Sequence, residues 1–165
     1  MWLLVGAIFV GLFALGALLG APYLPTRKQQ VTAALDLLDL KPGQLVLDLG
    51  SGDAGFLIAA AKQGINGIGY EINPILVMWS KLASWQYRQL VTIKWRNYWG
   101  EKLPPAEGIY VFLIGRYMKK LDSKLCAELT QPTKLASYTF KIPSKRVVEQ
   151  KNGVFLYGYN GDRYC

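Results

Sequence analysis

Apolar residues alternate between continuous runs and helical repeats along most of the chain. The continuous runs are typical of strands buried on both faces, and the repeats, with one apolar residue in every three or four, are typical of amphipathic helices. Strands are predicted at Leu45–Leu49, Gly67–Glu71, Leu90–Trp95, Gly108–Ile114 and Lys134–Phe140. Helices are predicted at Lys28–Leu38, Phe56–Gln63, Pro74–Tyr87 and Lys119–Leu129. This alternation predicts an α/β protein with a doubly wound, mainly parallel, Rossmann-like sheet.

The last part of the chain follows a different pattern. Arg146–Gln150 and Val154–Tyr159 flank Lys151-Asn152-Gly153. An Asn-Gly pair between two short apolar runs predicts a tight turn, because both residues tolerate a positive φ. The sheet is therefore expected to end in a C-terminal antiparallel hairpin.

The first 21 residues contain no charge, and roughly 20 apolar residues are needed for a helix to cross a bilayer. Arg27 and Lys28 follow soon after, which favours a cytoplasmic location for the remainder. We predict a single-pass membrane protein in three parts. Residues 1–21 form the transmembrane anchor, residues 22–44 a proline-containing leading segment with the first helix, and residues 45–165 the main domain on the cytoplasmic side. A cleaved signal peptide and a buried helix are the alternatives for the first part.

A glycine-rich turn follows the first predicted strand, with Gly50 and Gly52 at its centre. Glu71 ends the next strand about 20 residues later, the distance at which a carboxylate reaches ribose hydroxyls in a nucleoside-binding βαβ unit. Gly50, Gly52 and Gly55 also match the weak dinucleotide pattern, and a turn that merely connects strand and helix is a further alternative. Asp48 would repel a diphosphate but suits a ligand with an ammonium and a sulfonium. We therefore predict S-adenosylmethionine as the cofactor rather than NAD.

The composition narrows the chemistry further. The chain has 19 Lys and Arg against 11 Asp and Glu, a formal net charge of +8, two cysteines and no histidine. A basic surface suits an anionic membrane face or an acidic partner, and no arginine-rich run or aromatic platform indicates specific nucleic-acid binding. No metal site is predicted, because the usual zinc ligand spacing is missing.

Methyl transfer from a sulfonium requires the protein to align the nucleophile and to exclude water. A lysine nucleophile, whose amine has an ordinary pKa of about 10.4, must first lose a proton, and a partly desolvated pocket lowers that pKa. Tyr23, Trp99, Gly115 and Tyr117 are candidate walls of such a pocket, although packing alone also explains each of them.

Several motifs together resemble the membrane-anchored protein-lysine methyltransferases that modify the ATP synthase c subunit and the adenine nucleotide translocase. The matching stretches are Pro22-Tyr23-Leu24-Pro25-Thr26, Asp48-Leu49-Gly50-Ser51-Gly52-Asp53, Gly69-Tyr70-Glu71-Ile72-Asn73-Pro74, and Met118-Lys119-Lys120-Leu121 with Lys124-Leu125.

The resemblance implies that Asp48, Gly50 and Gly52 bind the methionine end of the cofactor and that Glu71 binds the ribose. Ser51 and Asn73 stand in the same motifs and join the predicted cofactor-binding residues, as does Asn97 after the third strand. Tyr23, Pro25, Thr26 and Trp99 are the predicted catalytic residues.

This chain departs from the family pattern at two places. Asp53-Ala54-Gly55 replaces the usual Asp-Gly-Arg, and Asn97 stands where an aspartate is common, although an amide can still bond to adenine. The expected function is methylation of a lysine on a membrane-embedded or membrane-associated protein. A small-molecule or lipid methyltransferase and a non-catalytic cofactor-binding module are the alternatives.

Overall fold

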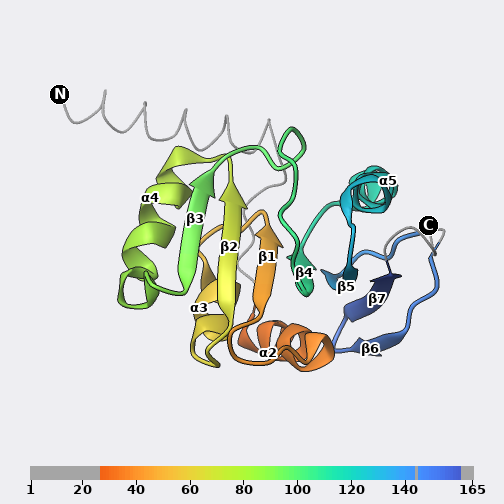
Figure 1. Ribbon diagram of the computed structural model, residues 1–165, viewed down its shortest axis with the longest axis horizontal. Coiled ribbons are helices and arrows are strands. Elements are labelled where there is room, and N and C mark those ends of the chain that lie inside the picture. Colours follow the sequence, from red (N-terminus) through yellow and green to blue (C-terminus); the bar gives the residue numbers. More distant parts are fainter. Residues whose placement is uncertain (1–26, 144, 161–165) are drawn as a thin grey trace.

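The computed structural model describes residues 27–143 and 145–160, which form a seven-stranded sheet with helices on both faces (Figure 1). The strands are β1 (Leu45–Leu49), β2 (Asn66–Glu71), β3 (Val91–Trp95), β4 (Gly108–Val111), β5 (Pro132–Tyr138), β6 (Glu149–Lys151) and β7 (Val154–Asn160). The α-helices are α2 (Lys28–Leu38), α3 (Gly55–Ala61), α4 (Pro74–Ala83) and α5 (Met118–Glu128). Two 3₁₀ turns, η1 (Trp85–Tyr87) and η2 (Gly115–Tyr117), complete the described elements.

The strand order is β3-β2-β1-β4-β5-β7-β6. β1 to β5 pair in parallel, whereas β7 runs antiparallel to β5 and β6 antiparallel to β7. The order reverses between β1 and β4, so the connections from these two strands leave in opposite directions. In open α/β sheets a ligand binds outside the carboxyl ends of the strands at such a point.

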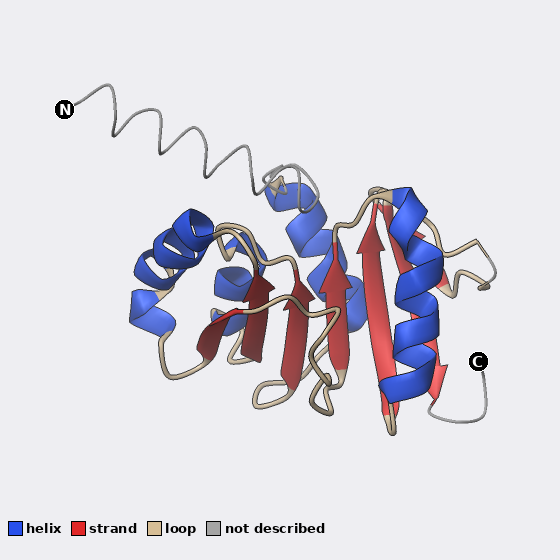
Figure 2. Cartoon of the chain, turned by 90° about the horizontal axis from the view of Figure 1, so that it is seen from above, coloured by secondary structure: helices blue, strands red, loops and turns tan. Residues whose placement is uncertain are grey.

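Two apolar cores lie on opposite faces of the sheet, with α2, α3 and α4 on one face and α5 on the other (Figure 2). Alternation along β1 feeds both cores: Val46 packs in the core under α2 and α3, and Leu47 and Leu49 pack in the core under α5. A strand covered on both faces needs apolar residues at every position, which explains the continuous run that predicted it.

The predicted fold class is confirmed, including the terminal hairpin, and the element boundaries differ from the prediction by a few residues. The largest difference is at α4, which was predicted to reach Tyr87 but ends at Ala83. Ser84 has a non-helical backbone conformation there, and η1 follows it. The first helix was predicted at its observed bounds, and Arg27 occupies its N-cap position.

The predicted membrane anchor, residues 1–21, also lies outside the described residues. Within residues 27–143 and 145–160, none of the helices has the length and apolar character to traverse a bilayer. The described residues therefore do not support the predicted single-pass membrane localisation, and it is not retained.

Candidate functional site

The carboxyl edge of the sheet gathers most of the predicted site residues. Asp48 lies in β1, with Gly50 and Gly52 in the turn that follows it, and Glu71 ends β2. Asn97 follows β3, and η2 follows β4. Parallel strands bring these chain segments to one edge, although they are far apart in the sequence.

The glycine turn packs tightly against the end of β2. Gly50 and Gly52 have φ angles of +111° and +53°, a region that favours glycine. The backbone N–H groups of Gly50 and Ser51 both donate to the carbonyl oxygen of Tyr70, at 3.0 Å each. A Cβ on Gly69 would lie 2.7 Å from the Ser51 side chain and from Leu57. The glycine in β2 therefore lets the turn and α3 approach the sheet closely.

The Glu71 carboxylate joins the glycine turn to the start of α4. Its Oε2 accepts the Gly52 N–H at 3.0 Å, and its Oε1 accepts the N–H groups of Ile72 and Asn73 at 2.8 Å each. Each carboxylate oxygen has about two acceptor directions. Oε1 is thus saturated, whereas Oε2 can accept one further hydrogen bond. That capacity suits one ribose hydroxyl at the position where the sequence predicts it.

Asp48 is buried at the end of β1, with 3 % of its surface exposed. Burial raises the pKa of its carboxyl well above the ordinary value of 3.8, and the nearby carboxylates of Glu71 and Asp53 raise it further. A cationic group placed beside Asp48 would reverse this effect by stabilising the charged carboxylate. The methionine end of S-adenosylmethionine supplies such a group in its ammonium.

Two further observations show that the turn fits a ligand. The Ser51 hydroxyl is buried without a hydrogen-bond partner among the described residues, and buried hydroxyls normally have one. A Cβ built on Gly50 would meet no atom within 4 Å, so space lies over the turn at that point. The open space over Gly50 is one that a nucleoside-type cofactor could fill, next in sequence to a buried hydroxyl that lacks a described partner.

The structure gives Asn73 and Asn97 local roles as well. Asn73 caps α4: its Oδ1 accepts the Ile75 N–H at 2.9 Å, ahead of Pro74 at the first helical position. Asn97 is exposed, and its Oδ1 accepts the Trp99 N–H at 3.1 Å. A direct cofactor contact by either residue stays a prediction.

A group of aromatic side chains forms the outer part of this edge. The Trp99 ring lies 6.2 Å from the Tyr117 ring, centroid to centroid, and the Lys120 Nζ lies 4.5 Å from the Trp99 centroid. Two of the predicted pocket walls are therefore brought together. The Lys120 ammonium is a cation–π partner of the Trp99 ring.

Phe140 is a residue of this edge that the sequence analysis did not single out. A Cβ on Gly115, another predicted wall, would lie 3.0 Å from its ring. The preceding residue, Thr139, has a φ of +73°, which is strained for a β-branched side chain. Its position at the carboxyl end of the predicted strand Lys134–Phe140 was the available signal. Tyr23, Pro25 and Thr26, the other predicted catalytic residues, lie outside the described residues.

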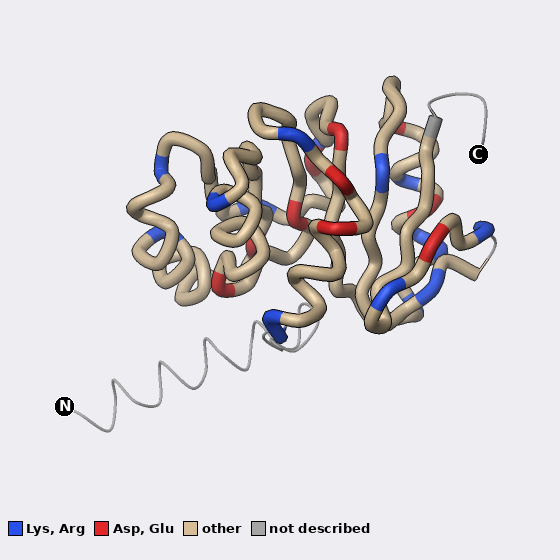
Figure 3. The backbone as a smooth tube through the Cα atoms, turned by 90° about the horizontal axis from the view of Figure 1, so that it is seen from below, with Lys and Arg blue, Asp and Glu red and all other residues tan. Residues whose placement is uncertain are grey.

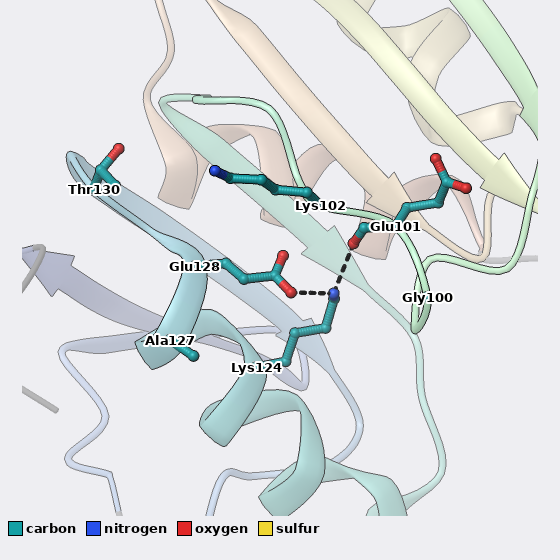
Figure 4. Close-up of a pocket in the computed structure, with 7 residues that line it drawn as sticks. All are labelled: Gly100, Glu101, Lys102, Lys124, Ala127, Glu128 and Thr130. Carbon is teal, nitrogen blue, oxygen red and sulfur yellow. Dashed lines mark hydrogen bonds and ion pairs between the residues drawn. The ribbon is translucent and has the colours of Figure 1, made fainter.

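A hollow of about 410 Å³ lies beside α5, lined by Gly100, Glu101, Lys102, Lys124, Ala127, Glu128 and Thr130 (Figure 4). Lys124 is already paired there: its Nζ donates to the Glu128 carboxylate and, at 2.8 Å, to the Glu101 carbonyl oxygen. Its ammonium therefore fastens the loop after β3 to α5. The hollow contains none of the predicted cofactor-binding residues. In the described part of the chain, no group of three or more His, Cys, Asp or Glu side chains is placed to hold a metal ion.

The fold matches solved methyltransferase structures. An RNA methyltransferase from Salinibacter ruber, in complex with S-adenosyl-L-homocysteine, superposes with a TM-score of 0.78 at 25 % identity, covering 86 % of this chain and 96 % of that one. A SAM-dependent methyltransferase from Thiobacillus denitrificans, also with S-adenosyl-L-homocysteine, gives a TM-score of 0.59 at 18 % identity, covering 73 % and 53 %. The sheet order, the glycine turn after β1 and the acidic end of β2 thus define a Rossmann-like methyltransferase domain of the S-adenosylmethionine-dependent class.

Sequence comparison places the chain more narrowly. Residues 48–149, more than half of the chain, match the family model described as the ANTKMT methyltransferase domain, and the chain belongs to this family. The ATP synthase c-subunit lysine N-methyltransferase of Xenopus laevis is 34 % identical over 127 residues, which cover 74 % of this chain and 55 % of that protein. The adenine nucleotide translocase lysine N-methyltransferase of Mus musculus is 32 % identical over 150 residues, covering 87 % and 65 %.

A protein-lysine N-methyltransferase of Saccharolobus islandicus is 28 % identical, covering 82 % of this chain and 92 % of that protein. The chain spans about half the length of the first ATP synthase c-subunit methyltransferases that it matches. At the level of the family, the predicted resemblance, the methyltransferase class and the S-adenosylmethionine cofactor are confirmed.

Proposed function

We propose that this protein transfers methyl groups from S-adenosylmethionine to the side-chain amine of a lysine on a membrane or membrane-associated protein. The observation that carries the proposal is the hydrogen bond between the Gly52 N–H and Glu71 Oε2, which holds a glycine turn and an acidic strand end together in a chain of this family. Relatives named for lysine methylation of the ATP synthase c subunit and the adenine nucleotide translocase support the choice of substrate class.

The cofactor supplies a methyl group bound to a positively charged sulfur. The Asp48 carboxylate offers a negative charge to the ammonium of the cofactor. Glu71 Oε2 offers its remaining acceptor direction to a ribose hydroxyl of the cofactor. The Ser51 hydroxyl supplies a further polar contact. These groups orient the ligand and leave the chemistry to alignment, since displacement at a sulfonium needs no proton donor.

The substrate lysine must arrive without its proton. Trp99 and Tyr117 are partly buried aromatic side chains at the carboxyl edge, and the exposed ring of Phe140 lies beside Gly115 at the same edge. An aromatic wall excludes water and lowers the pKa of an amine that lies against it, which raises the fraction of neutral nucleophile. The chain has no histidine, the commonest general base, and desolvation would activate the amine without one.

The test is transfer of labelled methyl groups from S-adenosylmethionine by the full chain, offered native membranes, which contain both proteins and lipids, and total RNA separately. We expect label in protein, released as methyl-lysine after hydrolysis and abolished by Glu71→Gln. Glu107→Gln serves as the control. The Glu107 carboxylate accepts a single backbone N–H, from Leu45 at 2.8 Å, and Glu107 is not one of the predicted site residues. Label in RNA would favour the activity named for the Salinibacter ruber structure, and label in lipid would favour a lipid methyltransferase. Either result would overturn the proposal.

A further inference from the structure

α4 presents its apolar side to solvent. Ile75, Met78, Trp79 and Leu82 follow the i, i+3, i+4, i+7 spacing of one helix face. Met78, Trp79 and Leu82 are 70 %, 59 % and 70 % exposed.

The opposite side, which packs on the sheet, carries small and polar residues instead. Val77 and Ser80 are the buried residues of α4, and Ser84 follows it. The hydroxyls of Ser80 and Ser84 donate back to the carbonyl oxygens of Val77 and Ser80, at 3.0 Å and 2.7 Å. α4 therefore reverses the usual order of a surface helix, in which the large apolar side chains face the core.

The apolar surface continues at both ends of the helix. Trp85 in η1 is 64 % exposed, and Trp95 at the end of β3 is 62 % exposed. Trp95 lies on the same side of β3 as Val91 and Ile93, and its indole N–H donates to the Ile72 carbonyl oxygen at 3.0 Å, just before α4. We call Met78, Trp79, Leu82, Trp85 and Trp95 the α4 face. It reaches the carboxyl edge of the sheet, where Trp95 on β3 lies opposite Glu71 on β2.

The surroundings of the α4 face are basic. From Ile72 to Gly100 the sequence contains no Asp or Glu, but it contains Lys81, Arg88, Lys94 and Arg96. Lys81, Arg88 and Arg96 are exposed, although the Arg96 Nε lies 3.9 Å from the Glu101 carboxylate, and the Arg88 guanidinium lies 5.0 Å from the Trp85 ring centroid. Figure 3 shows Lys and Arg in blue and Asp and Glu in red along the backbone, and α4 itself carries Lys81 and no acidic residue.

We propose that the α4 face seats this protein on the surface of an anionic lipid bilayer, without crossing it. Tryptophans together with Leu and Met suit the boundary between headgroups and acyl chains, and a Lys and Arg rim suits anionic headgroups. A second copy of the chain is a poorer occupant, because a two-fold contact would bring the same cations together. Residues 1–21 contain no acidic side chain and could not neutralise the rim.

This lipid contact goes beyond the proposed function and does not depend on methyl transfer. It would hold the carboxyl edge, with Glu71 and the glycine turn, next to the bilayer. A lysine of a membrane protein close to the headgroups would then lie within reach of the site.

Fluorescence quenching of the full chain tests the contact. The probe is phosphatidylcholine vesicles containing phosphatidylglycerol, with bromine on the acyl chains to quench any tryptophan that enters them. We expect quenching of the wild type and a clear reduction of that quenching in the Trp79→Phe/Trp85→Phe variant, in which Trp95 is the one tryptophan of the α4 face that remains, with Trp99→Phe as the control. Unchanged quenching in the double variant would overturn the proposal and place the contact elsewhere in the chain.

Vesicle sedimentation tests the basic rim. Lys81→Gln and Arg88→Gln should each weaken binding to the phosphatidylglycerol vesicles about fivefold, as for a cation near an anionic surface. Arg146→Gln, an exposed cation on the segment before β6 at the opposite end of the sheet, should leave it unchanged. Equal effects of all three variants would contradict the assignment, as would self-association without lipid that Leu82→Ser abolishes.

Discussion

Replacing Glu71 with glutamine should destabilise the domain because the side chain serves three backbone donors at once. A glutamine oxygen can keep the Ile72 and Asn73 N–H groups, but its NH₂ then faces the Gly52 N–H, so one hydrogen bond to a charged acceptor is lost. Such a bond is worth about 1.5–3 kcal/mol, and each remaining bond weakens by up to about 1 kcal/mol when its acceptor becomes neutral. Removing the charge also relieves repulsion with Asp48. We expect a net loss of about 2–4 kcal/mol, a large share of a typical stability of about 5–15 kcal/mol.

Urea unfolding at neutral pH, followed by circular dichroism, measures this loss as a lower midpoint at an unchanged slope. Glu107→Gln is the matched control, since the amide oxygen can keep the single bond from the Leu45 N–H, and it should cost less than about 1 kcal/mol. Equal losses in the two variants would refute the reasoning, because the three-donor arrangement would then contribute nothing beyond an ordinary carboxylate.

Three further predictions concern the same edge. Because the pKa of the Asp48 carboxyl is raised in the folded protein, its contribution to stability is present below the ordinary value of 3.8 and is lost as the pH rises through the folded value. The stability of Asp48→Asn relative to the wild type should therefore increase as the pH rises, measured by unfolding curves at a series of pH values. Ser51→Ala should change stability by less than about 0.5 kcal/mol but weaken S-adenosylhomocysteine binding about fivefold in calorimetry, since the hydroxyl has no described partner within the protein. Thr139→Gly should raise the free energy of unfolding by about 1 kcal/mol by relieving the positive φ, whereas Thr130→Gly should lower it by a similar amount.

The sequence predicted the strands well because each parallel strand is covered on both faces and so reads as a continuous apolar run. It also predicted Asp48 and Glu71 as residues of one βαβ unit, and the structure places them near the carboxyl ends of the adjacent parallel strands β1 and β2. The N-cap role of Asn73 was visible in principle, because an Asn directly before a Pro marks a helix start.

Other features depend on tertiary structure and could not be read from a pattern. The apolar positions Leu76, Val77, Leu82 and Trp85 predict a helix at α4, but periodicity does not say which side meets the sheet, and only Val77 among them is in the core. Phe140 reaches Gly115 because β4 and β5 are neighbours in the sheet. That contact has no local signature in either segment.

Calorimetric titration of the full chain with S-adenosylmethionine, S-adenosylhomocysteine and NAD tests the central claim most directly. The account predicts that the first two bind, that NAD does not, and that Glu71→Gln weakens binding far more than Glu107→Gln. Binding of NAD alone, or binding of S-adenosylhomocysteine that Glu71→Gln leaves unchanged, would contradict the assignment of the glycine turn and Glu71 as the cofactor site.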